Sequence, residues 1–410
     1  MTQNKLPKDW KWVSISEIAK IETGTTPSKA ISEYYGDEYP FYKPTDLAAG
    51  LNVFKSNDGL TKLGVDKARY VPENSTLITC IGATIGKTGF LKKGGGFNQQ
   101  INAIIPNENS LPKFIYYQAI SLNFQKQIKD NASATTLPLL NKSKFQVLKM
   151  VICSLETQQL IVSKIEELFS ELDKGIEDLK LAQQQLKTYR QSVLKYAFEG
   201  KLTNKKVKDG VLPKGWEWKT IKDITTLLGD GLHGTPNYDV NGEYFFINGN
   251  NLSDGKIEIK ANTKKVSKSE FEKYKKQLND KTIFVSINGS LGYTAFYNNE
   301  PVILGKSACY FNVKDEINKY YIRYIITSPR FTNYSIKNST GTTIKNVSLR
   351  SMREFEIPLP LLEEQHRIVE EIESRLSVAD KMEESINQSL LQAEALRQSI
   401  LKKAFEGKLV

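Results

Sequence analysis

The sequence predicts an α+β protein built from two similar halves, each a globular domain followed by a long helix. Three observations predict this class. Residues 190–202 return as residues 397–409, with eleven of thirteen positions identical. The pattern Leu-Pro-Lys-x-Trp-x-Trp stands at residues 6–12 and again at residues 212–218. A helical apolar pattern precedes each copy of the first segment. An offset of 206 or 207 residues is too long for a solenoid repeat and suits a whole domain.

The repeat also predicts how the elements are arranged. We expect two globular α/β-type domains separated by two long antiparallel helices that pack as in a coiled coil, with an internal pseudo-two-fold. After residue 202 a few polar residues lead into the motif at residues 212–218. Joining Val410 to Met1 would lead into the motif at residues 6–12 in nearly the same way, so we expect the chain ends to lie near each other. The predicted boundaries are residues 1–154 for the first globular domain, 155–203 for the first long helix, 204–356 for the second domain and 357–410 for the second long helix.

The globular halves contain short aromatic and β-branched runs broken by Gly, Pro and Asn, which predicts mainly strands and loops with some helix. Residues 75–81 and 281–287 are such runs, and a glycine-containing turn and another apolar run follow each. Helical patterns appear near residues 113–128 and 319–328. The segment 82–88 is similar to a phosphate-binding loop, but only three residues separate its glycines where four are needed. We therefore interpret it as a hairpin turn.

The two long helices are predicted from apolar residues that recur every three or four positions. The first face comprises Ile161, Ile165, Leu168, Leu172, Ile176, Leu179, Ala182, Leu186, Tyr189, Val193 and Ala197, and the second comprises Ile368, Ile372, Leu376, Ala379, Met382, Ile386, Leu390, Ala393, Leu396, Ile400 and Ala404. Gly200 and Gly407 stand where helices would end. We interpret both faces as core, paired with each other or bundled with another subunit. Each helix would form a stiff spacer of roughly 65 Å.

Charge is distributed unevenly along the chain, whose net charge is +11. Residues 1–150 and 206–356 each carry +7, whereas residues 151–205 are neutral and residues 357–410 carry −3. Two basic bodies joined by a neutral frame are typical of a nucleic-acid binder with two contact zones, although a merely soluble, Lys-rich protein would have the same composition.

Several features predict a cytoplasmic protein with no membrane segment. The mean hydropathy is −0.41, and no apolar run approaches the roughly 20 residues that span a bilayer. Residues 1–5 have no apolar signal region. Cys80, Cys153 and Cys309 are scattered without metal-ligand spacing or a disulfide framework, so we interpret them as small buried residues in a reducing compartment.

Signals of catalysis are missing from the sequence. The histidines are His233 and His366; we place His366 on a solvated helix face and His233 in a loop, where it is a weaker candidate for a ligand contact. The chain contains no Pro-Pro pair, and hence no Asp/Asn-Pro-Pro-aromatic motif of an amino-methyltransferase. No Gly-rich cofactor loop follows a predicted strand. We therefore expect a binding protein without catalytic residues and without a metal site.

Together these features resemble the specificity (S) subunit of type I restriction–modification systems. The residues that carry the resemblance are Gly24-Thr25-Thr26-Pro27 and Gly234-Thr235-Pro236, the helix entry Ile357–Gln365 with a weaker copy at Leu155–Gln158, and Ala-Phe-Glu-Gly-Lys-Leu at the end of both helices. The resemblance covers essentially the whole chain. Single motifs are loose, but their order, duplication and spacing are specific.

The resemblance implies a non-catalytic subunit with two target-recognition domains that recognise double-stranded DNA as two half-sites around an unread gap. It implies as partners two modification (methyltransferase) subunits, which bind S-adenosylmethionine and methylate adenine, and two restriction subunits, which use ATP and Mg. No cofactor is implied for this chain.

Candidate DNA-binding residues are loop side chains of the types that contact phosphates and base edges, each of which could equally be an ordinary turn or cap residue. In the first half they are Lys43, Thr45, Gln99, Gln100, Thr135, Thr136, Asn141 and Lys142, and in the second half Asn248, Asn250, Asn251, Lys306, Ser307, Thr342, Thr343, Lys345 and Asn346. Asn98 and Asn102 could as easily be structural.

Two other hypotheses remain at this stage. One is a fused methyltransferase or nuclease, which the missing cofactor loop and the missing Pro-Pro motif disfavour. The other is a scaffold that pairs two proteins through its helices, with the basic domains incidental to its function.

Overall fold

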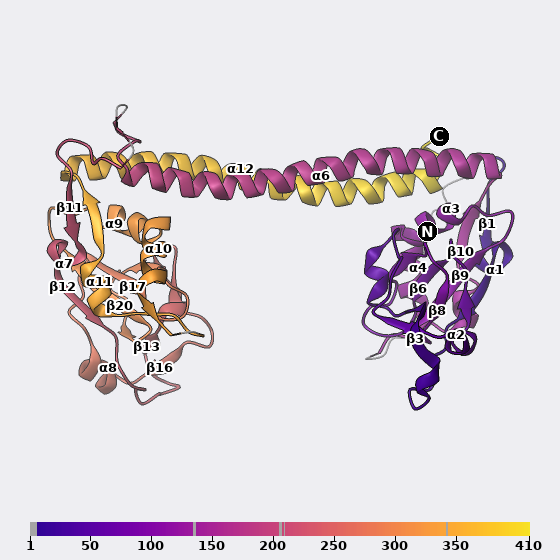
Figure 1. Cartoon of the computed structure of the whole chain (residues 1–410), viewed down its shortest axis with the longest axis horizontal. Helices are drawn as coiled ribbons and strands as arrows, with labels where there is room; N and C mark the ends of the chain where they lie inside the picture. Colours follow the sequence, from indigo (N-terminus) through magenta and orange to yellow (C-terminus); the bar gives the residue numbers. More distant parts are fainter. Residues whose placement is uncertain (1–5, 134–136, 205–206, 209, 342) are drawn as a thin grey trace. The chain divides into compact units, whose positions relative to one another are not determined.

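The chain folds into two compact units that share the two long helices. The structure is a computed structural model, which describes residues 6–133, 137–204, 207–208, 210–341 and 343–410. The first unit comprises residues 1–180 and 387–410, and the second comprises residues 181–386. Each unit therefore holds one globular domain, part of α6 (Leu155–Phe198) and part of α12 (Leu362–Phe405). Figure 1 shows α6 in magenta and α12 in orange to yellow.

The globular domain of the first unit contains two sheets and a short strand pair. The antiparallel sheet has the order β2 (Ala19–Thr23), β9 (Ile101–Pro106), β6 (Thr76–Thr79), β7 (Thr88–Phe90). The mixed sheet has the order β4 (Asp58–Leu60), β3 (Tyr35–Tyr42), β8 (Gly95–Phe97), β5 (Tyr70–Val71), with β3 and β8 parallel. The strand β1 (Lys11–Ser14) pairs with β10 (Lys149–Ile152), which leads into α6. The helices are α1 (Ile15–Ile18), η1 (Ser32–Tyr34), η2 (Asp46–Ala49), α2 (Lys62–Ala68), α3 (Pro112–Ala119), α4 (Leu122–Asn131) and α5 (Lys142–Phe145).

The second unit repeats this plan. Its antiparallel sheet has the order β12 (Thr225–Asp230), β20 (Ala308–Val313), β17 (Thr282–Ser286), β18 (Thr294–Phe296). Its second sheet has the order β16 (Lys264–Val266), β13 (Tyr244–Ile247), β19 (Val302–Leu304), with β13 and β19 parallel. The strand β11 (Glu217–Thr220) pairs with β23 (Glu356–Leu359), which leads into α12. The remaining elements are α7 (Ile221–Ile224), η3 (Gly249–Asn251), β14 (Leu252–Ser253), β15 (Lys256–Ile257), α8 (Lys268–Tyr274), α9 (Lys319–Ile326), α10 (Pro329–Asn338), β21 (Ser339–Thr340), β22 (Asn346–Val347) and α11 (Leu349–Glu354).

Strand alternation divides each core into two layers. In β6 the side chain of Ile78 packs into the cluster that contains α3, α4 and the start of α6, whereas its neighbour Leu77 packs toward the mixed sheet with Phe97. In β17, Ile283 and Phe284 divide in the same way between two clusters. Successive strand residues point to opposite faces, so strands buried on both faces are apolar at nearly every position.

The long helices end as the glycines predict. Gly200 has a φ of +73° and Gly407 a φ of +70°, the left-handed region that glycine adopts without strain. At each end the N–H of the following lysine donates to a carbonyl five residues earlier, Lys201 to Tyr196 at 2.9 Å and Lys408 to Lys403 at 2.9 Å. This bond satisfies carbonyls that a helix end would otherwise leave unpaired. The predicted stop signals are therefore confirmed.

The two helices pack together through the same ion pair in both units. In the second unit the Arg190 guanidinium lies 2.6 Å from Asp380 and 2.9 Å from Glu383. In the first unit Arg397 pairs with Asp173 and stacks 4.6 Å above the Phe169 ring. Within each unit the contacts join a late residue of one helix to an earlier residue of the other, as antiparallel helices require. The predicted fold class is confirmed.

Two sequence-based expectations need correction or refinement. Not every residue of the predicted apolar faces is core: Tyr189, Met382 and Leu396 are exposed, because one partner helix covers only part of a helix surface. The helical patterns near 113–128 and 319–328 are each two helices, α3 with α4 and α9 with α10. The turn after β6 is a hairpin into β7, as expected. The four predicted segment boundaries remain a prediction.

Candidate nucleic-acid interface

Four segments of the first unit that follow or join strands of its two sheets lie side by side. They are Gly24–Pro27 after β2, Lys43–Thr45 after β3, Gly82–Lys87 between β6 and β7, and Asn98–Gln100 between β8 and β9. The N–H of Thr25 donates to the Phe97 carbonyl at 3.0 Å, that of Asn98 to Tyr42 at 3.1 Å, and that of Cys80 to Gln100 at 2.7 Å. The Lys87 ammonium donates to the Thr45 carbonyl at 3.3 Å. Backbone contacts thus hold the four segments as one surface.

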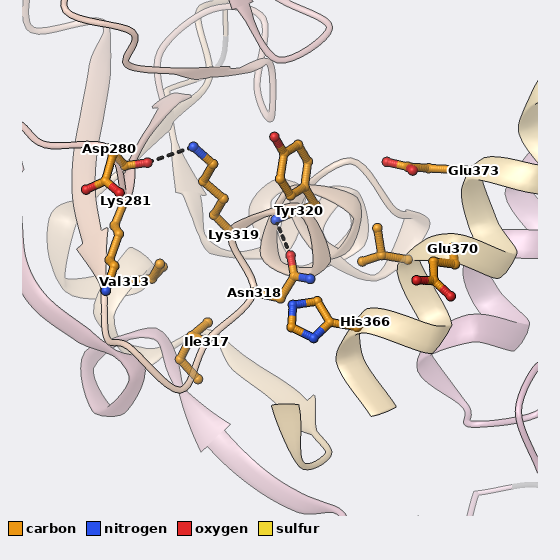
Figure 2. A pocket seen from close by; sticks show the side chains of 11 residues that line it. Asp280, Lys281, Val313, Ile317, Asn318, Lys319, Tyr320, His366, Glu370 and Glu373 are labelled. Carbon is orange, nitrogen blue, oxygen red and sulfur yellow. Dashed lines mark hydrogen bonds between the residues drawn. The ribbon is translucent and has the colours of Figure 1, made fainter. Parts of the chain in front are cut away.

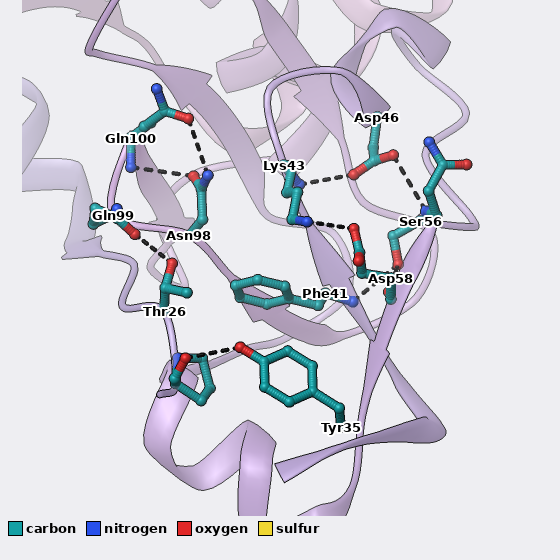
Figure 3. Close-up of polar contacts among 12 residues, drawn as sticks. Thr26, Tyr35, Phe41, Lys43, Asp46, Ser56, Asp58, Asn98, Gln99 and Gln100 are labelled. Atoms are coloured by element: carbon teal, nitrogen blue, oxygen red, sulfur yellow. Dashed lines mark hydrogen bonds and ion pairs between the residues drawn. The ribbon is translucent and has the colours of Figure 1, made fainter. Parts of the chain in front are cut away.

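Polar side chains on this surface are held in fixed orientations (Figure 3). The Thr26 hydroxyl bonds to the amide oxygen of Gln99, and the Asn98 amide donates to Gln100 at 3.1 Å. Gln99 is exposed and Gln100 half-buried, so both side chains are at least partly accessible at this surface. Amide side chains of this kind can bond two atoms of one base edge.

Two acidic side chains hold Lys43 in place. Its ammonium pairs with the Asp58 carboxylate, and its backbone N–H donates to Asp46 at 2.8 Å. The Asp46 carboxylate thus fixes the turn after β3, whereas exposed Thr45 stands at its tip. The positive charge that Lys43 contributes to the surface is therefore already partly neutralised by Asp58.

The second unit forms the same surface from different side chains. The Ser307 hydroxyl donates to the Asn248 amide oxygen at 3.1 Å and accepts from the Gly249 N–H at 2.8 Å. The Ser307 carbonyl accepts from the Ile287 N–H at 3.0 Å, as the Gln100 carbonyl accepts from Cys80. Lys306 and Asn250 are exposed beside them.

A glycine marks the same close approach in both units. A Cβ at Gly24 would collide with the Asn98 carbonyl, and a Cβ at Gly231 would collide with the Gly305 carbonyl. These glycines let the segment after β2 or β12 run against the loop before β9 or β20. The residue two positions later in the first unit, Thr26, thereby bonds to Gln99; the corresponding residue of the second unit is His233. His233 is exposed and pairs with Asp230.

A further loop joins the surface in each unit. The N–H of Gly82 donates to the Pro138 carbonyl at 2.9 Å, and the N–H of Gly289 donates to the Lys345 carbonyl at 2.9 Å. Asn346 bridges to Asn288 in the same contact. Thr343 and Lys345 are exposed on this loop. The structure therefore brings Lys345 and Asn346 to the surface that also holds Ser307.

Other predicted residues have structural roles or lie elsewhere. Asn141 caps α5 by accepting from the Lys144 N–H at 2.9 Å. Lys142 is exposed, 3.9 Å from Glu22. Asn251 is buried, where its amide donates to the Glu258 carbonyl at 2.9 Å. Asn98 and Asn102 are also buried. Thr135, Thr136 and Thr342 lie outside the described residues.

Sequence reasoning missed Arg69, which lies beside Gly24. Its φ is +61°, unusual for a residue with a side chain, and its guanidinium donates to the Thr23 carbonyl at 2.8 Å. Burial would raise the pKa of Glu22, but the hydrogen bond from Lys20 and the charges of Lys142 and Arg69 lower it. Three cations around one carboxylate leave an excess of positive charge at this edge. The positive φ of Arg69 depends on tertiary contacts, so no local sequence pattern indicated it.

Neither a metal centre nor a reactive thiol is evident in the described part of the chain. No group of three or more His, Cys, Asp or Glu side chains there could hold a metal ion. Burial raises the pKa of the Cys80 and Cys309 thiols to about 12. Nor is any helix among the described residues both long enough and apolar enough to cross a membrane.

A cavity of about 560 Å³ lies in the second unit, where α9 meets the first turns of α12. Figure 2 shows Asn318, Lys319 and Tyr320 on one side and His366 and Glu370 on the other. His366 is exposed here, as expected for a residue on a solvated helix face.

Comparison with known proteins agrees with this geometry. Residues 7–180 and 213–392 each match the model of the type I restriction modification DNA specificity domain. The type I restriction enzyme EcoBI specificity subunit of Escherichia coli is 24% identical over 420 residues, covering 98% of this chain and 86% of that protein. The MjaVIII specificity subunit of Methanocaldococcus jannaschii is 24% identical over 417 residues, covering 99% and 94%.

Two solved structures have the same fold. A chain from a type I R-M system, studied for complex assembly and conformational transition, has a TM-score of 0.74 at 18% identity and covers 98% of this chain and 99% of its own length. The HsdS subunit from Thermoanaerobacter tengcongensis has a TM-score of 0.61 at 18% identity, with 99% of both chains covered.

Proposed function

Because this chain belongs to the family of type I restriction modification DNA specificity domains, we propose that it is the DNA-recognition subunit of a type I restriction–modification complex. The observation that carries the proposal is the repeated loop surface around Gly24 and Gly231, which has one backbone framework and two sets of polar side chains. The subunit binds DNA and catalyses no reaction itself.

Each surface recognises one half-site, and the two half-sites differ in sequence. Gln99 and Gln100 in the first unit correspond to Lys306 and Ser307 in the second, since each pair joins the strands of equivalent sheets. Glutamine amides suit adenine, whereas a lysine ammonium suits guanine O6 and N7 or a phosphate. Two different side-chain sets on one framework therefore predict two half-sites of different sequence, and the family resemblance implies an unread gap between them.

The exposed and half-buried polar side chains of the surface are our candidates for base contacts. They are Thr45, Gln99 and Gln100 in the first unit and Asn248, Asn250, Lys306, Ser307, Thr343, Lys345 and Asn346 in the second. Lys43, Lys142 and Arg69 supply phosphate contacts, which position the protein without selecting a sequence.

The long helices dock the partner subunits. Tyr189, Met382 and Leu396 keep apolar side chains exposed on them, as expected for surfaces that another protein covers. We infer two modification subunits, which supply S-adenosylmethionine and the methyl transfer, and two restriction subunits, which supply ATP-driven activity with Mg. No residue of this chain is assigned to those steps.

The test is methylation by the complex assembled with its methyltransferase subunits, followed by sequencing of the methylated sites. We expect one bipartite motif. Gln99→Ala should relax one position of one half-site, and Lys306→Ala should affect only the other, each by about 1–3 kcal/mol of discrimination. Methylation by the purified chain alone would instead support a fused methyltransferase, and equal affinity of the complex for all DNA would support a scaffold.

A further inference from the structure

Each long helix begins with a buried glutamine that bonds to the globular domain of its unit. Gln158 in α6 has 0% of its surface exposed and Gln365 in α12 has 1%. Few glutamines are so completely buried in the first turn of a long helix, because an unpaired amide is costly there.

The two side chains make the same three hydrogen bonds. The Gln158 Nε2 donates to the Cys153 carbonyl at 2.9 Å and to the Asn109 carbonyl at 3.0 Å, and its Oε1 accepts from the Leu111 N–H at 2.8 Å. The Gln365 Nε2 donates to the Pro360 carbonyl at 2.9 Å and to the Glu316 carbonyl at 3.3 Å. Its Oε1 accepts from the Asn318 N–H at 2.8 Å.

These bonds join three segments that meet at the base of each domain. One is the exit of the strand β10 or β23, one is the first turn of the long helix, and one is the N-terminus of α3 or α9, where Leu111 or Asn318 is the capping residue. Both donors of each amide are used, so the joint is fully satisfied. We call this set of bonds the glutamine clasp.

Packing alone does not close the joint in the second unit. Asn318, whose N–H is held by Gln365, also lines the cavity between α9 and α12 (Figure 2). Tyr324 reaches Glu373 across this junction only at 3.5 Å. Apolar side chains of α9 and of the start of α12, such as Ile322 and Ile368, pack on one side of the joint, and the clasp adds the directional bonds that fix the angle between the two helices.

A small change in the angle between a domain and its long helix displaces the far side of the domain by more than the spacing of base pairs. A domain of this size is roughly 30 Å across. A tilt of about 10° at the joint therefore moves its far side by about 5 Å, more than the rise of about 3.4 Å per base pair along one strand.

We propose that Gln158 and Gln365 are positioning residues that set the angle between each recognition domain and its long helix, and so restrict the complex to one gap length between half-sites. This inference rests on the proposed function, since a gap exists only for a bipartite target. The clasp contacts no DNA and acts through the orientation of the surface.

The test uses the full chain assembled with its methyltransferase subunits and a DNA library in which the gap is varied one base pair at a time. Gln158→Met and Gln365→Met keep the size of the side chain and remove the hydrogen bonds. We expect methylation at gaps one base pair longer or shorter to rise about tenfold relative to the preferred gap, the selectivity of about one buried hydrogen bond. The half-site sequences should not change.

The matched control is Gln118→Met. Gln118 is also buried, but its side chain bonds to the Val151 backbone of β10 at 2.9 and 2.8 Å and not to the clasp. Its loss should lower the melting temperature without changing the gap. If a Met variant does not assemble, Gln158→Asn or Gln365→Asn, which keeps the amide on a side chain one methylene shorter and so weakens the same bonds, is measured in its place.

The outcomes distinguish a failure of the clasp proposal from a failure of the proposed function. A single unchanged gap in a folded clasp variant would overturn the role of the clasp, as would equal broadening in Gln118→Met. Failure of the wild-type complex to select any bipartite site would instead overturn the proposed function itself.

Discussion

The two units have the same backbone contacts but surround them with different side chains. Gly200 packs against Pro213 at the end of α6, and Gly407 packs against Pro7 at the end of α12. At the loop surface the second unit has Gly305 where the first has Asn98, and the Asn248 side chain fills the room that the missing side chain leaves. The contacts that build the scaffold are therefore repeated, whereas the side chains that it displays are not.

The contact at Gly407 also bears on the chain ends. The N-terminal residues 6–12 lie against the end of α12 in the first unit as residues 212–218 lie against the end of α6 in the second. Both junctions have the same packing of a glycine against a proline. The expectation that the ends of the described chain lie close together is confirmed within the first unit.

One difference distinguishes the two junctions. In the second unit the Glu364 carboxylate accepts from Trp216 Nε1 at 3.0 Å, from the Thr203 hydroxyl at 2.9 Å and from the Asn204 amide at 2.9 Å. The first unit has Thr157 at the equivalent position, before Gln158. The acidic residue thus anchors the connection that follows α6, whereas the first unit has no carboxylate at the equivalent position.

The largest expected effect comes from changing the element that the units share. Seven residues inserted after Gly175 in α6 and seven after Met382 in α12 add nearly two helical turns, or about 10 Å, to both helices and keep their faces in register. We expect the preferred gap to lengthen by about three base pairs with both half-sites unchanged, measured by methylome sequencing. Insertion into α6 alone should abolish activity. An altered half-site with an unaltered gap would contradict the spacer role.

The next largest effect is expected at the two loop surfaces, one in each unit. Gly24→Ala should destabilise the first unit and Gly231→Ala the second, each by about 2–3 kcal/mol, because the added methyl group meets backbone that cannot move easily. Each variant should lose one half-site only. Thermal unfolding and half-site binding measure both effects. Gly175→Ala is the control: nothing lies within 4 Å of its Cβ, so this change in a helix interior should stabilise the protein by about 1 kcal/mol. Loss of both half-sites in either surface variant would show that the surfaces are not independent.

A smaller effect is expected at the junction that differs. Glu364→Thr gives the second unit the residue of the first and leaves the Trp216 Nε1–H without its acceptor. We expect a loss of about 1–3 kcal/mol in the free energy of unfolding, measured by denaturant titration. The reference change is Thr157→Ser, which should alter stability little. An unaltered free energy in Glu364→Thr would mean that the connection is held by packing alone.

The smallest effect concerns the cysteines. Burial raises the pKa of Cys80 and Cys309 to about 12 and that of half-buried Cys153 to about 11. Since thiols ionise near pH 8.5 when unfolded, the unfolded chain loses these protons first, and stability should fall as the pH rises from about 8.5 toward 12. At pH 8 a thiol reagent should modify Cys153 first and the other two only on unfolding. Rapid labelling of Cys309 in the native protein would contradict its burial.

Sequence reasoning succeeded where the signal is local or repeated. The helix ends at Gly200 and Gly407, the apolar spacing of α6 and α12 and the hairpin after β6 all depend on residues close together in the chain, so their patterns survive without tertiary information. It failed at Tyr189 and Met382, whose exposure depends on how much of a helix the partner helix covers. Among candidate site residues, Asn141 was indistinguishable by type from Asn248, although one caps a helix and the other lies on the loop surface.

The sequence by itself determined that this protein is a duplicated α+β scaffold with two basic domains and two long helices, because periodicity and duplication are properties of residue order. Only the tertiary structure decided which polar side chains are displayed. Asn250 and Asn251 are neighbours of the same type, yet one is exposed and the other bonds to Glu258 in the interior. Loop conformation depends on contacts with strands far away in the chain, and no local pattern records those contacts.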